Sequence, residues 1–404
     1  MIATPSYTEE CSAAEPASGP PASLLVFADD WGRHPSSCQH LAGHLLARHD
    51  VYWVNTIGTR TPKIDLATLT RGLEKVRQWL SRPAAACSLP ANLRVLSPRM
   101  WPSFGSRFGR ELNRRLLLRQ LAPLLRSLPE LPVAVTTLPI VADLVGLLPV
   151  RRWVYYCVDD FGQWPGLDQP TLQAMEARLV ERADTIIAVS EHLQGRLASL
   201  GRASHLLTHG VETDYWAPGG AAVPLPELEG VERPLIVFWG VVDRRMDVAF
   251  VRRLAADLTR GTVVLVGPEA EHDPFLDRAP RVRRLPPLPF AQLPHLAREV
   301  AVLVMPYADL PVTRAMQPLK LKEYLATMRP TVVRDLPATR EWGDCLDLVD
   351  TPETFSRAVR LRVATGLPED QRSARARLAA ESWAAKAQAF ERWALAPETL
   401  RAAG

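Results

Sequence analysis

The segment QPLKLKEYLATMRPTVV (317–333) combines residue types and spacings that suit the binding of a phosphate and a sugar diol. Pro318 predicts the first turn of a helix, where a missing backbone N–H costs nothing. The N–H groups of that turn attract anions, and Lys320 adds a mobile positive charge for a phosphate. Glu323, one turn later, can accept hydrogen bonds from both hydroxyls of a ribose. The alternative is a surface ion pair between Lys320 and Glu323, worth about 0.2–0.5 kcal/mol.

Short apolar runs predict the strands that position this helix. They alternate with helical stretches in both halves of the chain, which indicates βαβ units and parallel sheets. Because the runs are apolar almost throughout, each sheet is expected to be covered on both faces. In the first half the runs are LLVFAD (24–29), VYWVN (51–55), LRVLS (93–97), VAVTT (133–137), WVYYC (153–157), TIIAVS (185–190) and HLLTH (205–209). In the second half they are LIVFWG (235–240), TVVLVG (262–267), VRRLP (282–286), AVLVMPY (301–307), PTVVRD (330–335) and LDLVD (346–350).

One segment interrupts the strand pattern and divides the chain into two α/β domains of similar size. APGGAAVPLPELEGVERP (217–234) is rich in Gly, Pro and acidic residues and indicates a linker. It separates a domain at 23–216 from a domain at 235–373. Residues 1–22 are small, polar and Pro-rich, which predicts a disordered tail. Open parallel sheets bind ligands beyond the carboxyl ends of their strands, so we expect the site in a cleft between the domains.

The last part of the chain, 374–404, is Ala-rich and predicts a helix. Apolar residues recur in it at spacings of three or four, namely Trp383, Ala387, Phe390 and Ala394. We therefore expect this helix to serve for packing, back toward the first domain.

The segment around Lys320 resembles the donor motif of retaining, nucleotide-sugar-dependent GT-B glycosyltransferases (group 1, family 4-like). Their pattern P-x-K-x-x-E-Y-L-A-x-G-x-P-V-V follows a strand that ends in Pro-Tyr, as AVLVMPY does here. The resemblance implies two Rossmann-like, doubly wound parallel-sheet domains that face each other across a cleft. It also implies that Glu323 holds the ribose of the donor. Lys320 and the backbone N–H groups near Pro318 and Leu319 would contact the diphosphate.

The sequence departs from the family pattern at two positions, and a separate stretch matches the pattern in outline. Ala315 stands where many members have a second glutamate, and Met328 stands where the usual residue is glycine. These departures indicate a divergent branch and put a sugar contact at position 315 in doubt. The stretch THGVETDYW (208–216), after AVSEHLQGRL (188–197), resembles the end of the family's first domain and supports the fold more than any mechanism.

A second donor-side segment is FWGVVDRRMDVAFVRRLA (238–255), where a strand ends at Gly240 and a helix begins near Asp247. The resembled enzymes place a basic residue here on the diphosphate, and Arg244 and Arg245 are the candidates. A planar guanidinium binds phosphate through two hydrogen bonds. The alternative is a pair of solvated arginines in a turn. Gly267 and Pro268, which end the next strand, are expected to border the nucleobase.

Two adjacent carboxylates follow a central strand in WVYYCVDDFGQWPG (153–166). Asp159 and Asp160 come just after the strand and are expected at the ligand-binding edge of the sheet. Buried neighbouring carboxylates resist ionising together, so a functional use is plausible. We interpret them as residues that orient an acceptor hydroxyl. The alternative is a helix cap or an ordinary loop pair.

The first βα unit, FADDWGRHPSSCQHLAGHLLARHDVYWVN (27–55), has no G-x-G-x-x-G fingerprint and instead carries polar and aromatic side chains. A helix is expected to start near Ser36. The loop resembles the first loop of GT-B enzymes, on the acceptor side. The candidate acceptor residues are Trp31, Gly32, Arg33, Gln39 and His40, and His34 is a candidate catalytic residue. Polar packing at a helix start is the alternative for each histidine.

Charge and composition narrow the class of protein. With 48 Lys+Arg against 44 Asp+Glu the net charge is only +4, which opposes a nucleic-acid binder. The five cysteines are scattered, which fits free thiols, and no signal peptide or membrane-spanning run is indicated. The stretch RFGRELNRRLLLRQLAPLLRSL (107–128) interleaves arginines with leucines. It predicts either an ordinary surface helix or a peripheral contact with the inner face of a membrane.

These patterns together predict a cytoplasmic hexosyltransferase of the polysaccharide-biosynthesis type. Donor and acceptor would need no metal and no further cofactor, since a helix start and basic residues can stabilise the leaving diphosphate. A nucleotide-sugar epimerase and a non-catalytic sugar-nucleotide scaffold are the alternatives. Only five basic residues are lysines, and two of them, Lys320 and Lys322, lie in the donor motif. Lys320 is therefore the most informative cation, while Lys322 is expected to be a surface charge. The sugar, base, acceptor and oligomeric state are left open.

Overall fold

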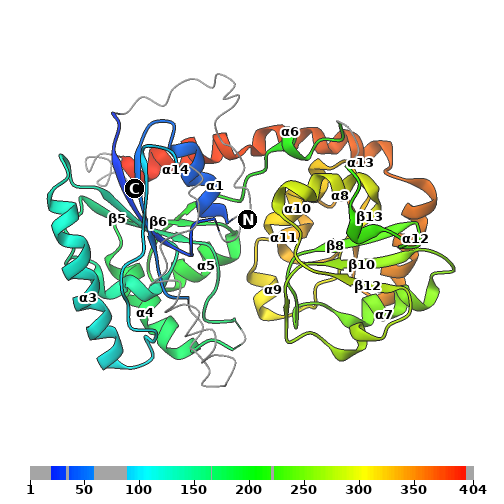
Figure 1. Cartoon of the computed structure of the whole chain (residues 1–404), viewed down its shortest axis with the longest axis horizontal. Coiled ribbons are helices and arrows are strands. Elements are labelled where there is room, and N and C mark those ends of the chain that lie inside the picture. The colour runs from blue at the N-terminus through cyan, green and yellow to red at the C-terminus, as the bar shows by residue number, and fades with distance from the viewer. Residues whose placement is uncertain (1–19, 33–35, 59–88, 165, 220–222, 397–404) are drawn as a thin grey trace. The chain divides into compact units, whose positions relative to one another are not determined.

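The protein contains two parallel β-sheets, one of seven and one of six strands, with helices packed around each (Figure 1). This confirms the predicted α/β class. The chain divides into two compact units: one comprises Thr208–Lys386, and the other ends at Leu207 and resumes at Ala387. The domain limits inferred from the sequence remain a prediction. The computed structural model describes residues 20–32, 36–58, 89–164, 166–219 and 223–396.

The N-terminal unit is built on a sheet in which all neighbouring strands are parallel, in the order β3-β2-β1-β4-β5-β6-β7. All seven apolar runs predicted for this half form strands. The side chains of β1, β2, β4, β5 and β6 are mostly buried, as a sheet with helices on both faces requires, whereas those of the edge strands β3 and β7 are mostly partly exposed. The strands are β1 (Ser23–Ala28), β2 (Asp50–Asn55), β3 (Leu93–Leu96), β4 (Val133–Thr136), β5 (Arg152–Cys157), β6 (Thr185–Ala188) and β7 (His205–Leu206).

Helices of this unit begin at polar caps that accept a hydrogen bond from the first turn. Ser36, Ser106, Asp168 and Ser190 each do so, and Ser36 confirms the predicted start of the first helix. The helices are α1 (Ser37–Leu45), α3 (Arg107–Arg126), α4 (Gln169–Arg182) and α5 (Glu191–Ser199), with a 3-10 helix at Pro139–Leu144.

The C-terminal unit has a parallel sheet in the order β12-β10-β8-β13-β14-β15, beside a two-stranded ladder of β11 and β9. The six apolar runs predicted for this half all form strands. The central strands β8 and β10 are fully buried, β13 is buried except at Ala301, and the three form the core of the unit. The strands are β8 (Leu235–Trp239), β9 (Val242–Asp243), β10 (Thr262–Val266), β11 (Glu269–Ala270), β12 (Val282–Leu285), β13 (Val300–Met305), β14 (Thr331–Arg334) and β15 (Asp347–Val349).

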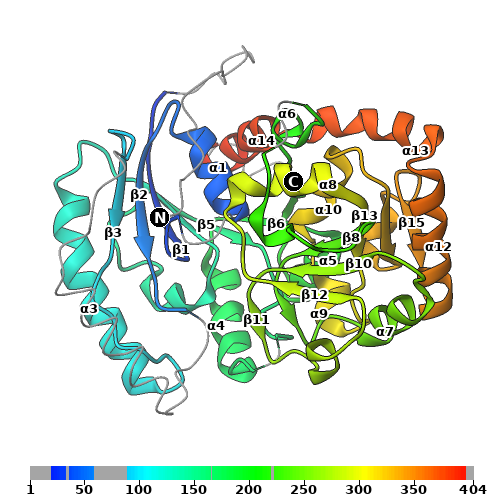
Figure 2. The same cartoon turned by 45° about the vertical axis from the view of Figure 1, so that its right-hand side comes forward.

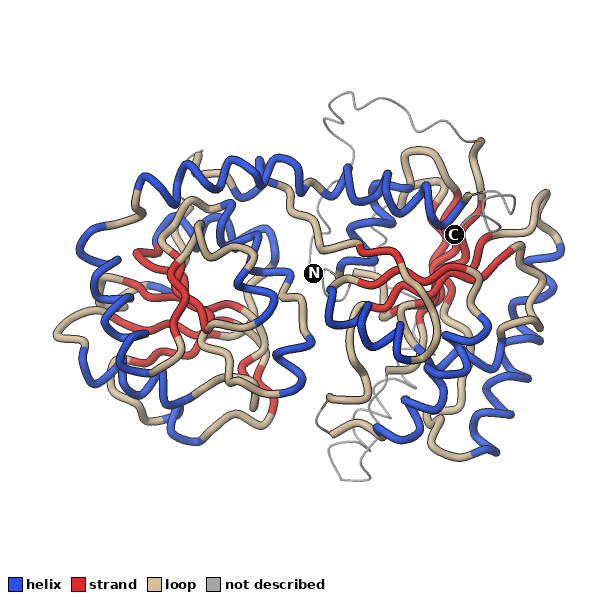
Figure 3. Tube along the Cα trace, turned by 180° about the vertical axis from the view of Figure 1, so that it is seen from behind, coloured by secondary structure: helices blue, strands red, loops and turns tan. Residues whose placement is uncertain are grey.

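The helices of the C-terminal unit surround its sheet, as the tube view shows (Figure 3). Asp247 caps α7 by accepting from the N–H of Ala249 at 3.1 Å, as predicted for the second donor-side segment. The α-helices are α6 (Thr213–Trp216), α7 (Val248–Asp257), α8 (Leu293–Glu299), α9 (Pro311–Ala315), α10 (Leu319–Ala326), α11 (Pro337–Arg340), α12 (Pro352–Thr365) and α13 (Glu369–Ala374). The 3-10 helices are Pro226–Leu228, Pro274–Asp277, Phe290–Gln292 and Arg375–Glu381.

The last helix, α14 (Trp383–Leu395), begins in the C-terminal unit and groups with the N-terminal unit from Ala387 onward. In the N-terminal unit, Phe390 packs edge-on against Tyr156 at 5.7 Å between ring centroids. Trp393 stacks on His205 at 4.7 Å. The four residues of the predicted apolar stripe are all buried, which confirms that it serves for packing.

Candidate functional site

Two glycines form the floor of the candidate donor site in the C-terminal unit. Gly240 follows β8 and Gly267 follows the neighbouring strand β10, and both have positive φ, 139° and 145°. A Cβ atom on Gly267 would lie 2.1 Å from the carbonyl oxygen of Gly240. Only glycine can bring the two backbones this close. The backbones at the carboxyl ends of these two strands therefore lie in direct contact, with Gly240 half-buried and Gly267 buried.

The amine of Lys320 lies directly above this glycine floor. A Cβ atom on Gly240 would come within 1.9 Å of the Lys320 Nζ atom. The amine is held over the rings of Phe238 and Tyr307, 4.3 and 5.4 Å from their centroids, where the ring faces attract a cation. Pro318 is the N-cap of α10, one residue before the predicted first-turn position, and Leu319 opens the helix. Among the described residues, no carboxylate forms an ion pair with Lys320.

Glu323 lies one turn further along α10 and is fixed by the end of β8. The indole N–H of Trp239 donates to its Oε2 at 3.4 Å. The adjacent Tyr324 phenol accepts from the backbone N–H of Trp239 at 2.9 Å and donates to its carbonyl at 3.3 Å. Burial raises the pKa of Glu323 to about 7, although the Trp239 hydrogen bond and the charge of Lys320 oppose the shift. Near neutral pH this carboxyl therefore exchanges between its acid and its carboxylate.

The two candidate arginines both have carboxylate partners. Arg245 is buried and forms an ion pair with Asp243 at 2.8 Å, and its Nη1 lies 3.6 Å from the sulfur of Met316. Arg244 is exposed and pairs with Glu271 at 3.1 Å. Their predicted contact with a diphosphate stays a prediction. Lys320 differs from both because its charge is not already neutralised by an ion pair.

Lys322 is not the surface charge that the sequence predicted. Its side chain is buried, forms an ion pair with Glu381 and donates to the carbonyl of His209 at 2.5 Å and the hydroxyl of Thr208 at 3.2 Å. Burial lowers the pKa of Lys322, while Glu381 opposes this shift. The lysine therefore anchors α10 to two distant segments of its unit, a role that neighbouring residues in the sequence do not reveal.

The two departures from the family pattern have different structural consequences. Met328 follows the C-cap of α10 and has φ 56°, the left-handed conformation usually taken by glycine after a helix. A non-glycine residue thus takes a conformation that favours glycine. Ala315 ends α9 and is buried. A methyl group at this position provides no polar contact from its side chain.

In the N-terminal unit, the two aspartates after β5 lie in different environments. Asp160 is buried, accepts from the N–H of Gly162 at 3.1 Å and lies 3.4 Å from the Nε of Arg196. Burial raises the pKa of Asp160, and the charge of Arg196 opposes this shift. Asp159 is partly exposed. The pair therefore offers one inward carboxylate and one accessible carboxylate.

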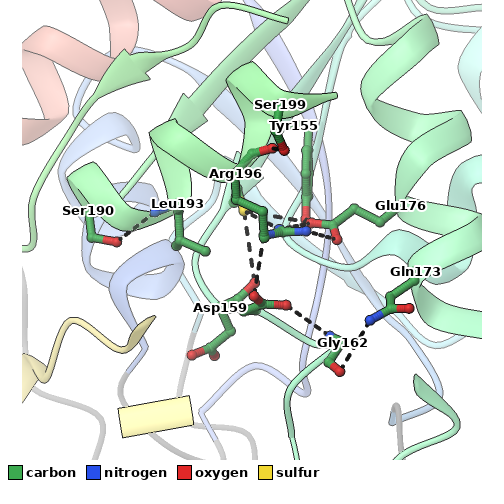
Figure 4. Close-up of polar contacts among 11 residues, drawn as sticks. Tyr155, Asp159, Gly162, Gln173, Glu176, Ser190, Leu193, Arg196 and Ser199 are labelled. Atoms are coloured by element: carbon green, nitrogen blue, oxygen red, sulfur yellow. Dashed lines mark hydrogen bonds and ion pairs between the residues drawn. The ribbon is translucent and has the colours of Figure 1, made fainter. Parts of the chain in front are cut away.

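A buried ionic network that the sequence analysis missed supports this turn (Figure 4). Arg196, on α5, binds both carboxylate oxygens of Glu176 through Nη1 and Nη2 at 2.7 and 2.6 Å. The Tyr155 hydroxyl donates to Glu176 at 2.6 Å. Glu176 is 1% exposed. Its place beside Leu172, Met175, Leu179 and Val180, on the apolar stripe of α4, is the signal that predicts its burial.

The acceptor-side loop is held by hydrogen bonds from its own backbone. The N–H of Trp31 donates to Asn55 at 3.0 Å, and the indole packs edge-on against Trp53 at 4.8 Å. The N–H of Gly32 donates to the side-chain oxygen of Gln39 at 3.1 Å. Gln39 and His40 are both buried in the first turn of α1. Arg33 and His34 lie outside the described residues.

The described ranges contain neither a metal-binding cluster nor a membrane-spanning helix. No group of three or more His, Cys, Asp or Glu side chains is gathered there as a metal-binding cluster. In the same residues, no helix combines the length and the apolar character needed to cross a bilayer.

Comparisons with known proteins agree with this architecture. The chain is 29% identical over 176 residues to a protein named as a teichuronic acid biosynthesis glycosyltransferase, TuaH, of Bacillus subtilis (strain 168). That match spans 42% of the chain and 44% of the relative, so the chain covers less than half of the relative's length. No protein-family model matches.

Solved structures match over nearly the whole chain. Sucrose-phosphate synthase of Thermosynechococcus elongatus superimposes with a TM-score of 0.66 at 15% identity, covering 92% of this chain and 98% of that one. Anabaena HepE, solved with UDP and glucose, has a TM-score of 0.57 at 14% identity and covers 92% and 95%. With two parallel sheets of seven and six strands matched in this way, the chain has the two-domain GT-B fold, as its donor-like motif predicted.

Proposed function

We propose that the protein is a glycosyltransferase that moves a sugar, in the first instance a hexose, from a nucleoside-diphosphate sugar to a hydroxyl acceptor. The names of its similar proteins support this: the Bacillus relative is named a glycosyltransferase, and HepE was solved with UDP and glucose. We also propose that the sugar is transferred with retention at the anomeric carbon, as the resemblance of the donor motif implies. The epimerase alternative draws no support from these names.

The observation that carries the proposal is the position of the Lys320 amine. It lies over the glycine floor at the carboxyl ends of β8 and β10, where parallel sheets bind ligands. It adjoins the N-terminus of α10, whose N–H groups and dipole favour anions. A diphosphate placed there would receive the positive charge of Lys320 and the N–H groups of the first turn. As the sugar leaves, these groups would stabilise the charge that develops on the diphosphate.

Glu323 would hold the ribose in this arrangement. Its carboxylate lies one helical turn from Lys320 on α10, so a nucleoside with its diphosphate at the helix start would present its hydroxyls one turn away. Trp239 fixes one carboxylate oxygen, which leaves capacity for further hydrogen bonds. No metal takes part in this proposal, because the lysine and the helix start provide the positive charge at the leaving group.

The N-terminal unit would bind the acceptor. Asp159 is the more accessible of the two aspartates and would orient the attacking hydroxyl, while Asp160 keeps its turn in place through Arg196 and Gly162. Trp31 offers a partly exposed ring against which a sugar could stack. We also propose that the protein is located in the cytoplasm and makes a peripheral contact with the membrane.

A panel of nucleoside-diphosphate sugars tests the function. A true donor should raise the unfolding temperature, because it binds the native state only. Turnover of that donor should require an added hydroxyl acceptor. Donor consumption that is equally fast without acceptor would favour an epimerase or hydrolase. Binding without turnover in any acceptor extract would favour a non-catalytic scaffold.

The pH dependence of donor binding tests the role of Glu323. With a pKa of about 7, roughly a tenth of the ligand-free protein carries the carboxylate at pH 6, so UDP should bind about tenfold more weakly there than at pH 8. Isothermal calorimetry measures this. Since the pKa of Glu323 is raised above its usual 4.5, the stability that this group contributes to the ligand-free fold should be lost as the pH rises from 4.5 through 7.

Glu323→Gln is the matched control for that profile, since it keeps the shape and cannot ionise. The titration of the diphosphate itself is common to both proteins, so the ratio of their dissociation constants isolates the contribution of Glu323. If the ratio is the same at pH 6 and pH 8, the carboxylate does not bind the ribose.

A further inference from the structure

Helix α10 is too short to hold its own position. It has eight residues, Leu319–Ala326, and isolated helices shorter than about 12–15 residues are marginal in water. This helix nevertheless carries Lys320 and Glu323, the two side chains of the proposed donor site. Their positions therefore depend on the elements that pack against the rest of α10.

The 3-10 helix Arg375–Glu381, which we call the bracing helix, lies beside α10. Figures 1 and 2 both show the chain after α13 passing along the side of the C-terminal unit that holds α10. The Arg375 Nη1 atom donates to the carbonyls of Leu325 at 3.2 Å and Arg329 at 2.9 Å. These carbonyls flank the turn in which α10 ends. Because Arg375 is buried, the bracing helix fixes this turn from inside the unit.

The other end of the bracing helix holds the middle of α10. Glu381 accepts a hydrogen bond from the amine of Lys322. That amine also donates to the carbonyl of His209 and to the hydroxyl of Thr208. Lys322 follows Lys320 by two residues, which places the two side chains about 200° apart around the helix. The bracing helix therefore holds α10 on the face turned away from the glycine floor.

Glu381 has a second positive charge beside it, from outside α10. The amine of Lys386 pairs with Glu381 at 2.7 Å and donates to the hydroxyl of Thr208 at 3.0 Å. A partner for the Glu381 carboxylate is thus present without Lys322. The contact from Lys322 adds what Lys386 does not provide, a direct link between the bracing helix and α10.

We propose that Lys322 and Arg375 are positioning residues of the donor site, and that they couple the binding of a nucleoside diphosphate on α10 to the bracing helix. The inference rests on the proposed function and adds a second element to its donor site. Coupling between two sites is reciprocal. A diphosphate that holds Lys320 and Glu323 in place should therefore also steady the bracing helix. Loosening the bracing helix should, in turn, weaken the binding of the diphosphate.

Hydrogen exchange of the full-length protein, measured by mass spectrometry, tests the effect of the ligand. The probe is whichever of UDP, GDP and ADP the wild type binds most tightly by calorimetry. At saturation it should slow exchange in peptides that cover residues 375–386. The effect should exceed that in peptides from α12, which belongs to the same unit and packs on α7. A bracing helix whose exchange does not respond to the bound diphosphate would overturn the proposal.

Lys322→Met tests the reverse effect. Methionine keeps an unbranched apolar side chain, and Glu381 retains Lys386, so the variant should fold, as near-ultraviolet circular dichroism can verify. Its affinity for the diphosphate should fall by about fivefold or more, the lower end of typical coupling between sites. The bound diphosphate should also no longer slow exchange over residues 375–386. A purely stabilising lysine would lower the unfolding temperature and leave both of these readouts unchanged, which would contradict the proposal.

Arg372→Gln is the matched control, because it removes one positive charge just before the bracing helix. Arg372 is exposed and pairs with Glu369 at 3.3 Å. Its loss should change neither the affinity nor the exchange over residues 375–386. An equal fall in affinity in this variant would overturn the proposal, since a lost charge alone would explain it. A wild type that binds none of the three diphosphates would overturn the donor site as well, whereas binding without these responses would overturn the coupling alone.

Discussion

Replacing Lys320 by alanine is expected to weaken the binding of UDP, or of whichever nucleoside diphosphate the enzyme uses, by about 10- to 150-fold. A hydrogen bond to a charged group contributes about 1.5–3 kcal/mol, and Lys320 is the cation at the helix start without a carboxylate ion pair among the described residues. The fold should tolerate the change because the amine contacts ring faces, not a buried carboxylate. Isothermal calorimetry at fixed salt measures the effect.

A second substitution perturbs the same amine from the opposite side. In Gly240→Ala the new methyl group would lie 1.9 Å from Nζ, so the lysine must move away from the glycine floor. Because φ at this position is 139°, the alanine is also strained, by about 1–3 kcal/mol. UDP affinity should fall in this variant although Lys320 is still present. An unchanged affinity would mean that the amine does not contact the diphosphate.

Lys386→Ala is the matched lysine control. Its amine lies in the same unit, but it already pairs with Glu381 at 2.7 Å and is engaged away from the glycine floor. We expect its loss to change UDP affinity by less than about twofold. If Lys320→Ala and Lys386→Ala weaken binding equally, the effect is general electrostatics and the donor site must be placed elsewhere.

The fold could be predicted from the sequence because its strands are continuous apolar runs. Runs such as LIVFWG and AVLVMPY became the central strands β8 and β13, whose residues are covered on both faces. The helix starts at Ser36 and Asp247 followed from residues that cap helices. These signals are local, so each could be interpreted without knowing its neighbours in space.

The polar interior could not be predicted in the same way, because the partners lie far apart in the sequence. Lys322 was expected at the surface, yet its partner Glu381 is 59 residues away and supplies the opposite charge that makes burial tolerable. The lysine's own motif contains no hint of this. Burial alone would raise the pKa of Glu381, but Lys322 and Lys386 together hold it below its usual value.

Breaking the buried ion pair between Arg196 and Glu176 is expected to lower the free energy of unfolding more than any other change considered in the N-terminal unit. Arg196→Ala removes the guanidinium that binds both oxygens of a carboxylate that is 1% exposed. Breaking a buried pair by deleting one partner costs about 3–5 kcal/mol, because the remaining charge is left uncompensated. Urea unfolding, followed by near-ultraviolet circular dichroism, should show a loss of that size. Arg178→Ala, which breaks a partly exposed pair with Asp143 at 2.8 Å, should cost less than about 1 kcal/mol.

The double variant Arg196→Met with Glu176→Gln separates the pair from simple packing. If the loss comes from an uncompensated charge, removing that charge should restore about half or more of the stability, since apolar or neutral replacements of a buried pair are often tolerated. A double variant that is as unstable as the sum of the single variants would contradict the network.

The same variants show whether the network positions the aspartates. The Nε of Arg196 lies 3.4 Å from the carboxylate of Asp160. The nearby Cys157 thiol is buried, and burial raises its pKa to about 12, so we expect it to react slowly in the native protein. In Arg196→Lys, which keeps a charge but not the two-pronged contact, the turn should loosen while most of the stability remains. Cys157 should then react faster with an alkylating reagent, as resolved by mass spectrometry. The KM for the acceptor should rise more than the KM for the donor. Equal changes in both would mean that Arg196 stabilises the unit without positioning Asp159 and Asp160.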